Sequence, residues 1–168
     1  MDELRGRVWR FGDDISTDVL SPGTYAVAPV EERMTHCLES VNPRFPLEVQ
    51  PGDVVVAGRN FGCGSSREQA PENLKALGVG CVAAESLARI FMRNAVAIGL
   101  PILICPGLYA AFADGDEIAL DLAAGTVRRS DGSVLQGEPL PDEMREILAA
   151  GGILSVLRRQ QEADTSGG

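Results

Sequence analysis

Three short apolar runs, separated by two helix-like segments, constrain the fold of this chain more than any other feature. The apolar runs are residues 53–57, 80–84 and 101–105. The segments between them are residues 66–77 and 86–98. Each helix-like segment is followed at once by a glycine, Gly78 or Gly99, as is typical where a helix ends. The order strand–helix–strand–helix–strand, with short connections, predicts an α/β fold with a parallel β-α-β-α-β layer.

Further elements are expected on both sides of this layer. Residues 6–11 alternate between apolar and polar side chains, which predicts an opening strand, and residues 13–29 have the composition of a loop. After residue 106 the pattern changes to short alternating runs around Asp131-Gly132, a dipeptide that favours a hairpin turn. Residues 141–150 then form a helix-like run that begins with a proline. We therefore expect a C-terminal hairpin and helix after the parallel layer.

No internal repeat or linker divides the sequence. We expect one domain over residues 1–157, and a polar, flexible tail over residues 158–168. The 168 residues carry a formal net charge of −9, which argues against a nucleic-acid partner. The longest apolar runs contain Gly and Pro and are too short to span a membrane. The N-terminus is charged and lacks an apolar signal segment, so we expect a cytoplasmic protein.

The four cysteines are widely spaced and form no C-x-x-C pair, so this chain is expected to carry neither a metal nor a disulfide framework. The candidate site is instead the junction between the strand at 53–57 and the helix that follows it. Two glycines, two serines and an arginine stand there: Gly62, Gly64, Ser65, Ser66 and Arg67. A strand–turn–helix junction exposes backbone N–H groups that attract anions, and a guanidinium binds carboxylate or phosphate through a planar fork of donors. The junction predicts an anion site with hydroxyls available for chemistry.

Several interpretations of this junction compete. Ser65 and Glu68 fit the S-x-x-E capping box, so Ser65 serves equally well as a helix cap. A dinucleotide fingerprint would need a third glycine where Arg67 stands. A serine hydrolase would need the one histidine, His36, as its base, and the G-x-S-x-G motif is absent. A serine alkoxide stabilised by turn N–H groups is a further possibility, provided that a metal on a partner makes the substrate acidic.

Three spaced motifs resemble those of one known family. They are Phe61-Gly62-Cys63-Gly64-Ser65-Ser66-Arg67-Glu68-Gln69-Ala70-Pro71, Asp14-Ile15-Ser16-Thr17-Asp18 and Ser86-Leu87-Ala88-Arg89-Ile90-Phe91-Met92-Arg93-Asn94. Together they resemble the swivelling domain of the aconitase superfamily, and more narrowly the free-standing small subunit of 3-isopropylmalate dehydratase and its close relatives. The match runs from about residue 5 to residue 107, and the C-terminal hairpin and helix are compatible with it.

The resemblance implies a swivelling β/β/α fold and an enzyme of the hydro-lyase class that is active only with a large partner subunit, as a heterodimer or heterotetramer. It implies a [4Fe–4S] cluster on the large subunit and no cofactor on this chain. The reaction would be the reversible dehydration and rehydration of a 2-hydroxy dicarboxylic or tricarboxylic acid, most simply 3-isopropylmalate of leucine biosynthesis. The cluster would act as a Lewis acid while the small subunit closes the site and supplies the base.

The resemblance also assigns functions to residues. It implies that the Ser65 alkoxide removes the proton next to a carboxylate. The residues that shape the site and bind substrate would be Gly64, Ser66, Arg67, Thr17, Asp18 and Ser21. Asp18 has a structural alternative, because an Asp in such a loop often bonds backbone N–H groups. A loop that would contact the variable part of the substrate contains Thr24, Tyr25, Ala26 and Val27.

Two departures from the family pattern bear on specificity. Gln69 stands where the family commonly has His, which keeps hydrogen bonding but removes a titratable group. Isopropylmalate enzymes usually carry an arginine near Thr24 or Val27, whereas this loop is small and apolar. Homoaconitate, citraconate or methylmalate, and dimethylmalate therefore stay open as substrates beside 3-isopropylmalate. A hypothesis of another class is a non-catalytic module that binds small dicarboxylates at residues 62–67.

Overall fold

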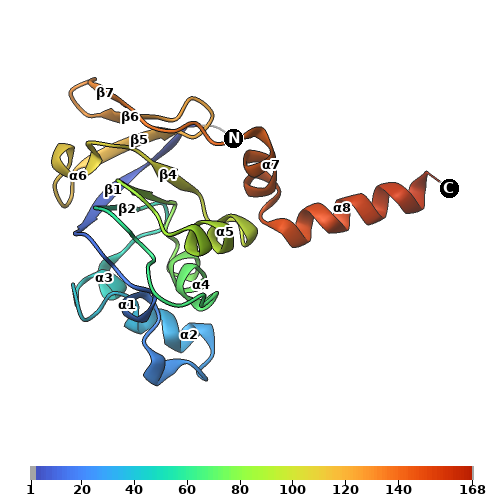
Figure 1. Ribbon diagram of the computed structural model, residues 1–168, viewed down its shortest axis with the longest axis horizontal. Helices are drawn as coiled ribbons and strands as arrows, with labels where there is room; N and C mark the ends of the chain where they lie inside the picture. The colour runs from blue at the N-terminus through green and yellow to red at the C-terminus, as the bar shows by residue number, and fades with distance from the viewer. Residues whose placement is uncertain (1–2, 168) are drawn as a thin grey trace.

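Seven strands form one mixed sheet in the computed structural model, which describes residues 3–167 (Figure 1). The strand order across the sheet is β4-β3-β2-β1-β5-β6-β7. Four neighbouring strands are parallel: β1 (Leu4–Phe11), β2 (Val54–Ala57), β3 (Cys81–Ala84) and β4 (Ile102–Ile104). The other three are antiparallel: β5 (Glu117–Asp121), β6 (Thr126–Arg129) and β7 (Val134–Gln136). The predicted parallel layer and the C-terminal hairpin are both confirmed.

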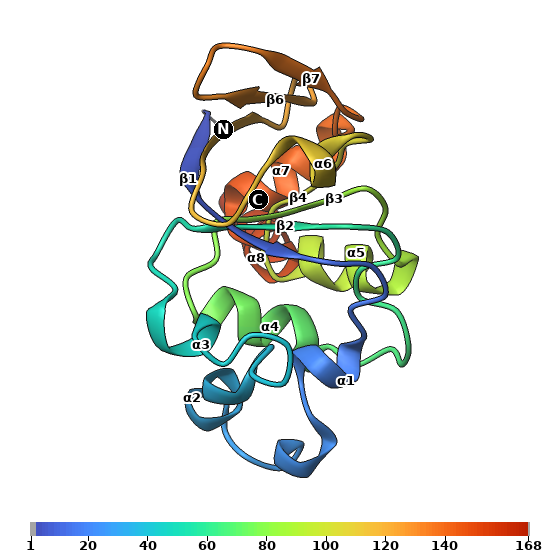
Figure 2. The same cartoon turned by 90° about the vertical axis from the view of Figure 1, so that its left-hand side faces the viewer.

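The central strands are buried because helices cover them. Every residue of β2 and β3 is buried, as expected for continuous apolar runs in a parallel sheet. Figure 2 shows α4 (Gln69–Ala76) and α5 (Arg89–Ala97) on one side of the parallel strands, and the short α6 (Leu108–Ala111) on the other. The core is therefore a sheet packed between helical layers.

The long connection between β1 and β2 is mostly loop, as its composition predicted. It is interrupted by single helical turns, which gather at one end of the sheet (Figure 2). These are α1 (Thr17–Leu20), η1 (Gly23–Tyr25), α2 (Val30–Arg33), η2 (Met34–His36) and α3 (Phe45–Glu48). Three of these turns, α1, α2 and η2, pack on α4, so this connection is held against the first crossover helix.

Two helices complete the chain after the hairpin. They are α7 (Asp142–Ala150), which follows Pro141 as predicted, and α8 (Ile153–Ser166), which projects from the body in Figure 1. The tail expected from residue 158 is thus helical through Ser166; its flexibility stays a prediction. Arg, Gln and Glu are good helix formers, which explains a helix with so polar a sequence. Among the described residues, no helix combines the length and apolar character needed to cross a bilayer.

Candidate active site

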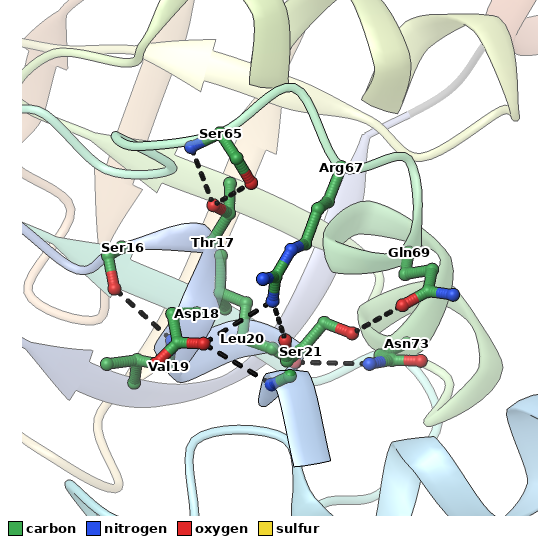
Figure 3. A network of polar contacts seen from close by, with 11 residues as sticks. Ser16, Thr17, Asp18, Val19, Leu20, Ser21, Ser65, Arg67, Gln69 and Asn73 are labelled. Carbon is green, nitrogen blue, oxygen red and sulfur yellow. Dashed lines mark hydrogen bonds and ion pairs between the residues drawn. The ribbon is translucent and has the colours of Figure 1, made fainter. Parts of the chain in front are cut away.

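Two loops that are far apart in the sequence meet at the carboxyl ends of β1 and β2 (Figure 3). The backbone N–H of Gly62 donates to the carbonyl of Ile15 at 2.7 Å, and that of Thr17 donates to the carbonyl of Cys63 at 2.8 Å. Ser16 and Cys63 consequently form an isolated parallel bridge. These backbone bonds place α1 directly beside the turn that carries Ser65.

Aromatic packing against Gly62 fixes the turn at residues 62–64. Phe61 and Phe91 are buried and lie edge to face, with ring centroids 5.2 Å apart. Gly62 has a φ of +84°, and a Cβ at this position would lie only 2.3 Å from Cγ of Phe91. A glycine is therefore required both by the backbone conformation and by the ring that packs against it.

Ser65 and Thr17 share a pair of hydrogen bonds. The backbone N–H of Ser65 donates to Oγ1 of Thr17 at 3.1 Å, and the two hydroxyl oxygens are also 3.1 Å apart. Because Oγ1 of Thr17 already accepts from the Ser65 N–H, its own hydrogen is free to donate to Oγ of Ser65. Thr17 is buried while Ser65 is exposed, so the serine hydroxyl faces solvent over a buried donor.

The capping interpretation of Ser65 is wrong. Helix α4 begins at Gln69 rather than at residue 66; its N-cap is Glu68, and no side chain caps it. The capping box does not form because Gly64, with a φ of +109°, turns the chain so that Ser65 hydrogen-bonds Thr17. The first backbone N–H groups of the helix therefore lie beyond Ser65, and an anion site at this junction stays a prediction.

Arg67 reaches across to α1. Its Nη1 donates to the carbonyl of Ser21 at 2.8 Å and lies 3.4 Å from Oδ1 of Asp18. That Asp18 oxygen also accepts from the backbone N–H of Gly23 at 3.3 Å, so the turn-forming role considered for Asp18 is confirmed. Within residues 3–167, Nη2 of Arg67 makes no hydrogen bond, and the side chain is 37% exposed. Half of the guanidinium fork is thus available to an external carboxylate.

The remaining predicted residues divide into two groups. Ser21 is buried beside Arg67, and its hydroxyl donates to Oε1 of Gln69 at 3.2 Å. Ser66 is exposed next to Ser65, and its carbonyl accepts from Nδ2 of Asn94 at 3.3 Å. Figure 3 shows Ser65, Arg67, Thr17, Asp18 and Ser21 gathered in one place, and Gly64 and Ser66 are the chain neighbours of Ser65. The structure therefore brings together every polar residue that the sequence had placed in the site.

The loop of residues 23–28 borders this surface. Tyr25 stacks on His36 with ring centroids 3.6 Å apart, and the tip residue Val27 is fully exposed. Nδ1 of His36 lies 2.7 Å from Oε1 of Glu39. The histidine is therefore engaged by the loop and by a carboxylate, and it makes no hydrogen bond with Ser65 among residues 3–167. The serine-hydrolase hypothesis has no base in this structure.

Three further residues hold the site: sequence reasoning noted Gln69 only as a departure from the family pattern, and it did not identify Asn73 or Arg33. Gln69 bonds the Ser21 hydroxyl, as noted above. Asn73, fully buried on α4, donates to the carbonyl of Leu20 at 3.1 Å and accepts from Nη1 of Arg33 at 3.2 Å. Arg33, itself buried, also donates through Nε to the carbonyl of Ala28 at 3.0 Å. The only sequence signal was for Asn73, a polar residue on the otherwise apolar face that α4 buries.

The cysteines stand apart from the site chemistry. Burial raises the pKa of the Cys37 and Cys81 thiols far above their ordinary value of 9.0. Burial, and secondarily the charge of Glu85, also raises the pKa of Cys105. Only Cys63 is partly exposed, in the turn before Ser65. Within residues 3–167, no group of three or more His, Cys, Asp or Glu side chains is placed to hold a metal ion, so these residues do not fit an iron–sulfur cluster.

Comparison with known proteins identifies relatives along the whole length of the chain. The family model described as "Aconitase C-terminal domain" matches residues 25–105. The chain is 52% identical to "3-isopropylmalate dehydratase small subunit 1" of Methanopyrus kandleri, over 95% of each chain. It is 45% identical to "Methanogen homoaconitase small subunit" of Methanothermobacter thermautotrophicus, over 98% of this chain and 96% of that protein. A crystal structure of 3-isopropylmalate dehydratase from Methanocaldococcus jannaschii superposes with a TM-score of 0.92 at 38% identity, covering 99% of this chain and 100% of that one.

Proposed function

The chain belongs to the aconitase superfamily as a small subunit of the 3-isopropylmalate dehydratase type, and on that premise we propose that it supplies the general base of a two-subunit hydro-lyase. The observation that carries the proposal is the exposed Ser65 hydroxyl, held 3.1 Å from the buried Thr17 hydroxyl. We also propose that the large subunit carries the [4Fe–4S] cluster; among residues 3–167 of this chain, no group of three or more His, Cys, Asp or Glu side chains is placed to hold a metal ion. We further propose that this chain and the large subunit associate as a heterodimer or heterotetramer, and that the complex is cytoplasmic.

In this proposal, Ser65 acts as an alkoxide. Its Oγ takes the proton from the carbon next to a substrate carboxylate, the C–H electron pair forms the carbon–carbon double bond, and the neighbouring carbon loses its hydroxyl as hydroxide, for which the large subunit would supply a Lewis acid. The proton stays on Oγ and returns to carbon when hydroxide adds again. Thr17 supports this step because its hydroxyl is free to donate to Oγ of Ser65, and a donated hydrogen bond stabilises the anionic form of the acceptor.

Substrate binding is proposed to centre on Arg67. Its Nη1 is anchored by the Ser21 carbonyl and faces Asp18, so the guanidinium plane is oriented before substrate arrives. The free Nη2 then offers a donor to one substrate carboxylate, with Ser66 and the backbone of Gly64 on the same exposed surface. Preorientation of this kind lowers the entropic cost of binding.

For the substrate, we propose 3-isopropylmalate. Residues 24–27 are Thr, Tyr, Ala and Val, and Val27 is fully exposed at the tip, so this loop offers an apolar surface to an apolar substituent. The family pattern of isopropylmalate enzymes usually has an arginine near these positions, but the apolar loop observed here suits an isopropyl group better than the third carboxylate of homoaconitate, which would call for a cation that these four residues lack. Homoaconitate, citraconate or methylmalate, and dimethylmalate are the alternatives, with any further cation supplied by the large subunit.

The test is a dehydratase assay on the assembled protein. The chain is co-expressed with its candidate large subunit, the cluster is reconstituted without oxygen, and absorbance of the unsaturated acid is followed for each candidate 2-hydroxy acid. We expect turnover only when both chains are present, with 3-isopropylmalate preferred. A complex that forms with an intact cluster but converts none of these acids would overturn the substrate proposal. Binding of dicarboxylates by the chain alone, without activity in any complex, would instead support the non-catalytic module.

A further inference from the structure

Gln69 links two parts of the candidate site through a single amide group. Its Oε1 accepts from the hydroxyl of Ser21 at 3.2 Å, and its Nε2 donates to the carbonyl of Ala26 at 2.9 Å (Figure 3 shows the Ser21 contact). We propose that Gln69 is a positioning residue, which fixes the substrate-facing loop at residues 23–28 and the guanidinium of Arg67 relative to one another. The proposal rests on the function proposed above.

The link to Arg67 passes through Ser21. The hydroxyl of Ser21 bonds Gln69, whereas its carbonyl accepts from Nη1 of Arg67 at 2.8 Å. Ser21 is only 1% exposed, so water cannot readily replace either partner. Gln69 and Arg67 thus bond the hydroxyl and the carbonyl of one buried residue, and a shift of Ser21 would be transmitted to the guanidinium.

The link to the loop is the more distinctive one. Among the described residues, the Gln69 amide is the only side chain that hydrogen-bonds the backbone of residues 24–27. Asp18 bonds the N–H of Gly23 before this stretch, and Arg33 bonds the carbonyl of Ala28 after it. The stacking of Tyr25 on His36 adds an apolar contact but does not fix the backbone direction. Without Gln69, the middle of the loop would keep only its internal turn bonds.

The chemistry of the amide explains why this position is sensitive. The two contacts require one acceptor and one donor about a single planar group, which Gln supplies without ionising. Gln69→Met has a similar shape but provides neither contact. Gln69→Glu keeps an acceptor for Ser21, but as a carboxylate it cannot donate and would face the Ala26 carbonyl. Both variants leave α4 intact, because Met and Glu are good helix formers.

The first experiment needs no partner and no catalysis. Amide hydrogen exchange is measured by mass spectrometry on the isolated full-length chain, comparing peptides that cover residues 22–29 in the wild type, Gln69→Met and Gln69→Glu. We expect exchange in this loop to rise about tenfold in both variants, because each loses the hydrogen bond to the Ala26 carbonyl, while the core strands keep their protection. Unchanged exchange in the loop of a folded Gln69→Met chain would overturn the proposal.

The second experiment uses the assembled enzyme. We expect Gln69→Met to raise KM about tenfold with a smaller fall in kcat, and to narrow the preference between acids that differ in their variable group. Gln69→Glu should raise KM to a similar extent at neutral pH. Its KM should fall again as the pH is lowered, because a protonated carboxyl can donate to the Ala26 carbonyl. In an enzyme that already carries Arg67→Lys, Gln69→Met should raise KM by a smaller factor than it does in the wild type. A KM and a substrate preference equal to those of the wild type would contradict the proposal.

Gln136→Met is the matched control. The Gln136 amide donates to the carbonyls of Ala124 and Gly137 in the hairpin region, at the opposite end of the molecule from α1 (Figure 1). The same substitution there should change neither loop exchange nor KM. The two proposals also fail separately: faster loop exchange in a complex that lacks hydro-lyase activity would sustain the positioning of the loop and reject the function.

Discussion

The parallel strands and the polar site at their ends are stabilised in different ways. In β2 and β3 every side chain is buried, and the geometry follows from apolar packing between helical layers. At the site, the segment that contains α1 and the turn before α4 are joined by side-chain and backbone hydrogen bonds between residues almost fifty positions apart. The first region is held by area removed from water and the second by a few directional bonds. Changes in the core should therefore alter stability, and changes at the site should alter function.

Ser65→Ala is expected to have the largest effect on function and almost none on stability. Loss of a general base lowers kcat by about 10²–10⁴-fold. Thr17 keeps one of its two hydrogen bonds in the variant, because the backbone N–H of residue 65 still donates to its Oγ1. The measurement is kcat of the assembled enzyme, together with urea unfolding of the isolated chain.

The control for this variant is Ser130→Ala, in the exposed turn between β6 and β7. It removes the same hydroxyl far from the site and should keep wild-type kcat. If Ser65→Ala retains turnover within tenfold of the wild type, the serine is not the base. If Ser65→Ala lowers the free energy of unfolding by several kcal/mol, the site also stabilises the fold and the distinction between the two regions is wrong.

Leu103→Ala tests the other side of the comparison. Leu103 lies in β4 with no exposed surface, so truncation should lower the free energy of unfolding by about 2–5 kcal/mol. Leu47→Ala is the matched control, since Leu47 is 82% exposed and should change stability by less than about 0.5 kcal/mol. Urea unfolding measures both. At a temperature where the Leu103→Ala complex is folded, its KM should equal that of the wild type; a raised KM would show that the core and the site are coupled.

This division also explains what the sequence could predict. The elements β2, α4, β3, α5 and β4 follow from apolar periodicity and terminal glycines, and the hairpin follows from Asp131-Gly132. Such signals lie within a few residues of the structure that they specify. The fold and the hairpin were accordingly confirmed, with helix boundaries displaced by one to three residues.

The site could be predicted only in part. The composition of the turn indicated Ser65 and Arg67, while Thr17, Asp18 and Ser21 entered through the resemblance to a family. The predicted start of α4 was wrong. The sequence contains a local capping pattern at Ser65, but in the structure Ser65 hydrogen-bonds Thr17 and the helix begins at Gln69. The function of Gln69 was beyond reach for the same reason: its partners, Ser21 and Ala26, lie more than forty residues away in the chain.

Arg67→Lys should produce an intermediate functional effect. A lysine keeps the charge but cannot hold the Ser21 carbonyl and offer a second, coplanar donor to substrate. We expect KM to rise about tenfold with a smaller change in kcat, and no loss of stability beyond about 1 kcal/mol, because the guanidinium is partly exposed. Arg129→Lys, on an exposed ion pair of β6, is the control that should change neither constant. An unaltered KM for Arg67→Lys would contradict the proposal that Arg67 binds a substrate carboxylate.

The smallest expected effect comes from the buried thiols and acts on stability alone. Burial raises the pKa of Cys37 and Cys81 above the ordinary value of 9.0. In the folded chain both thiols therefore keep their protons at a pH where the unfolded chain releases them. Their contribution is fully present well below pH 9 and is lost as the pH rises, by about 0.4 kcal/mol per thiol between pH 8 and pH 9 and by about 1.4 kcal/mol per pH unit beyond. Cys81→Ala should flatten this decline in urea unfolding relative to the wild type. Equal slopes in the wild type and Cys81→Ala would mean that the buried thiols ionise within the folded core. Because neither thiol hydrogen-bonds a residue of the site, kcat should not follow this pH dependence.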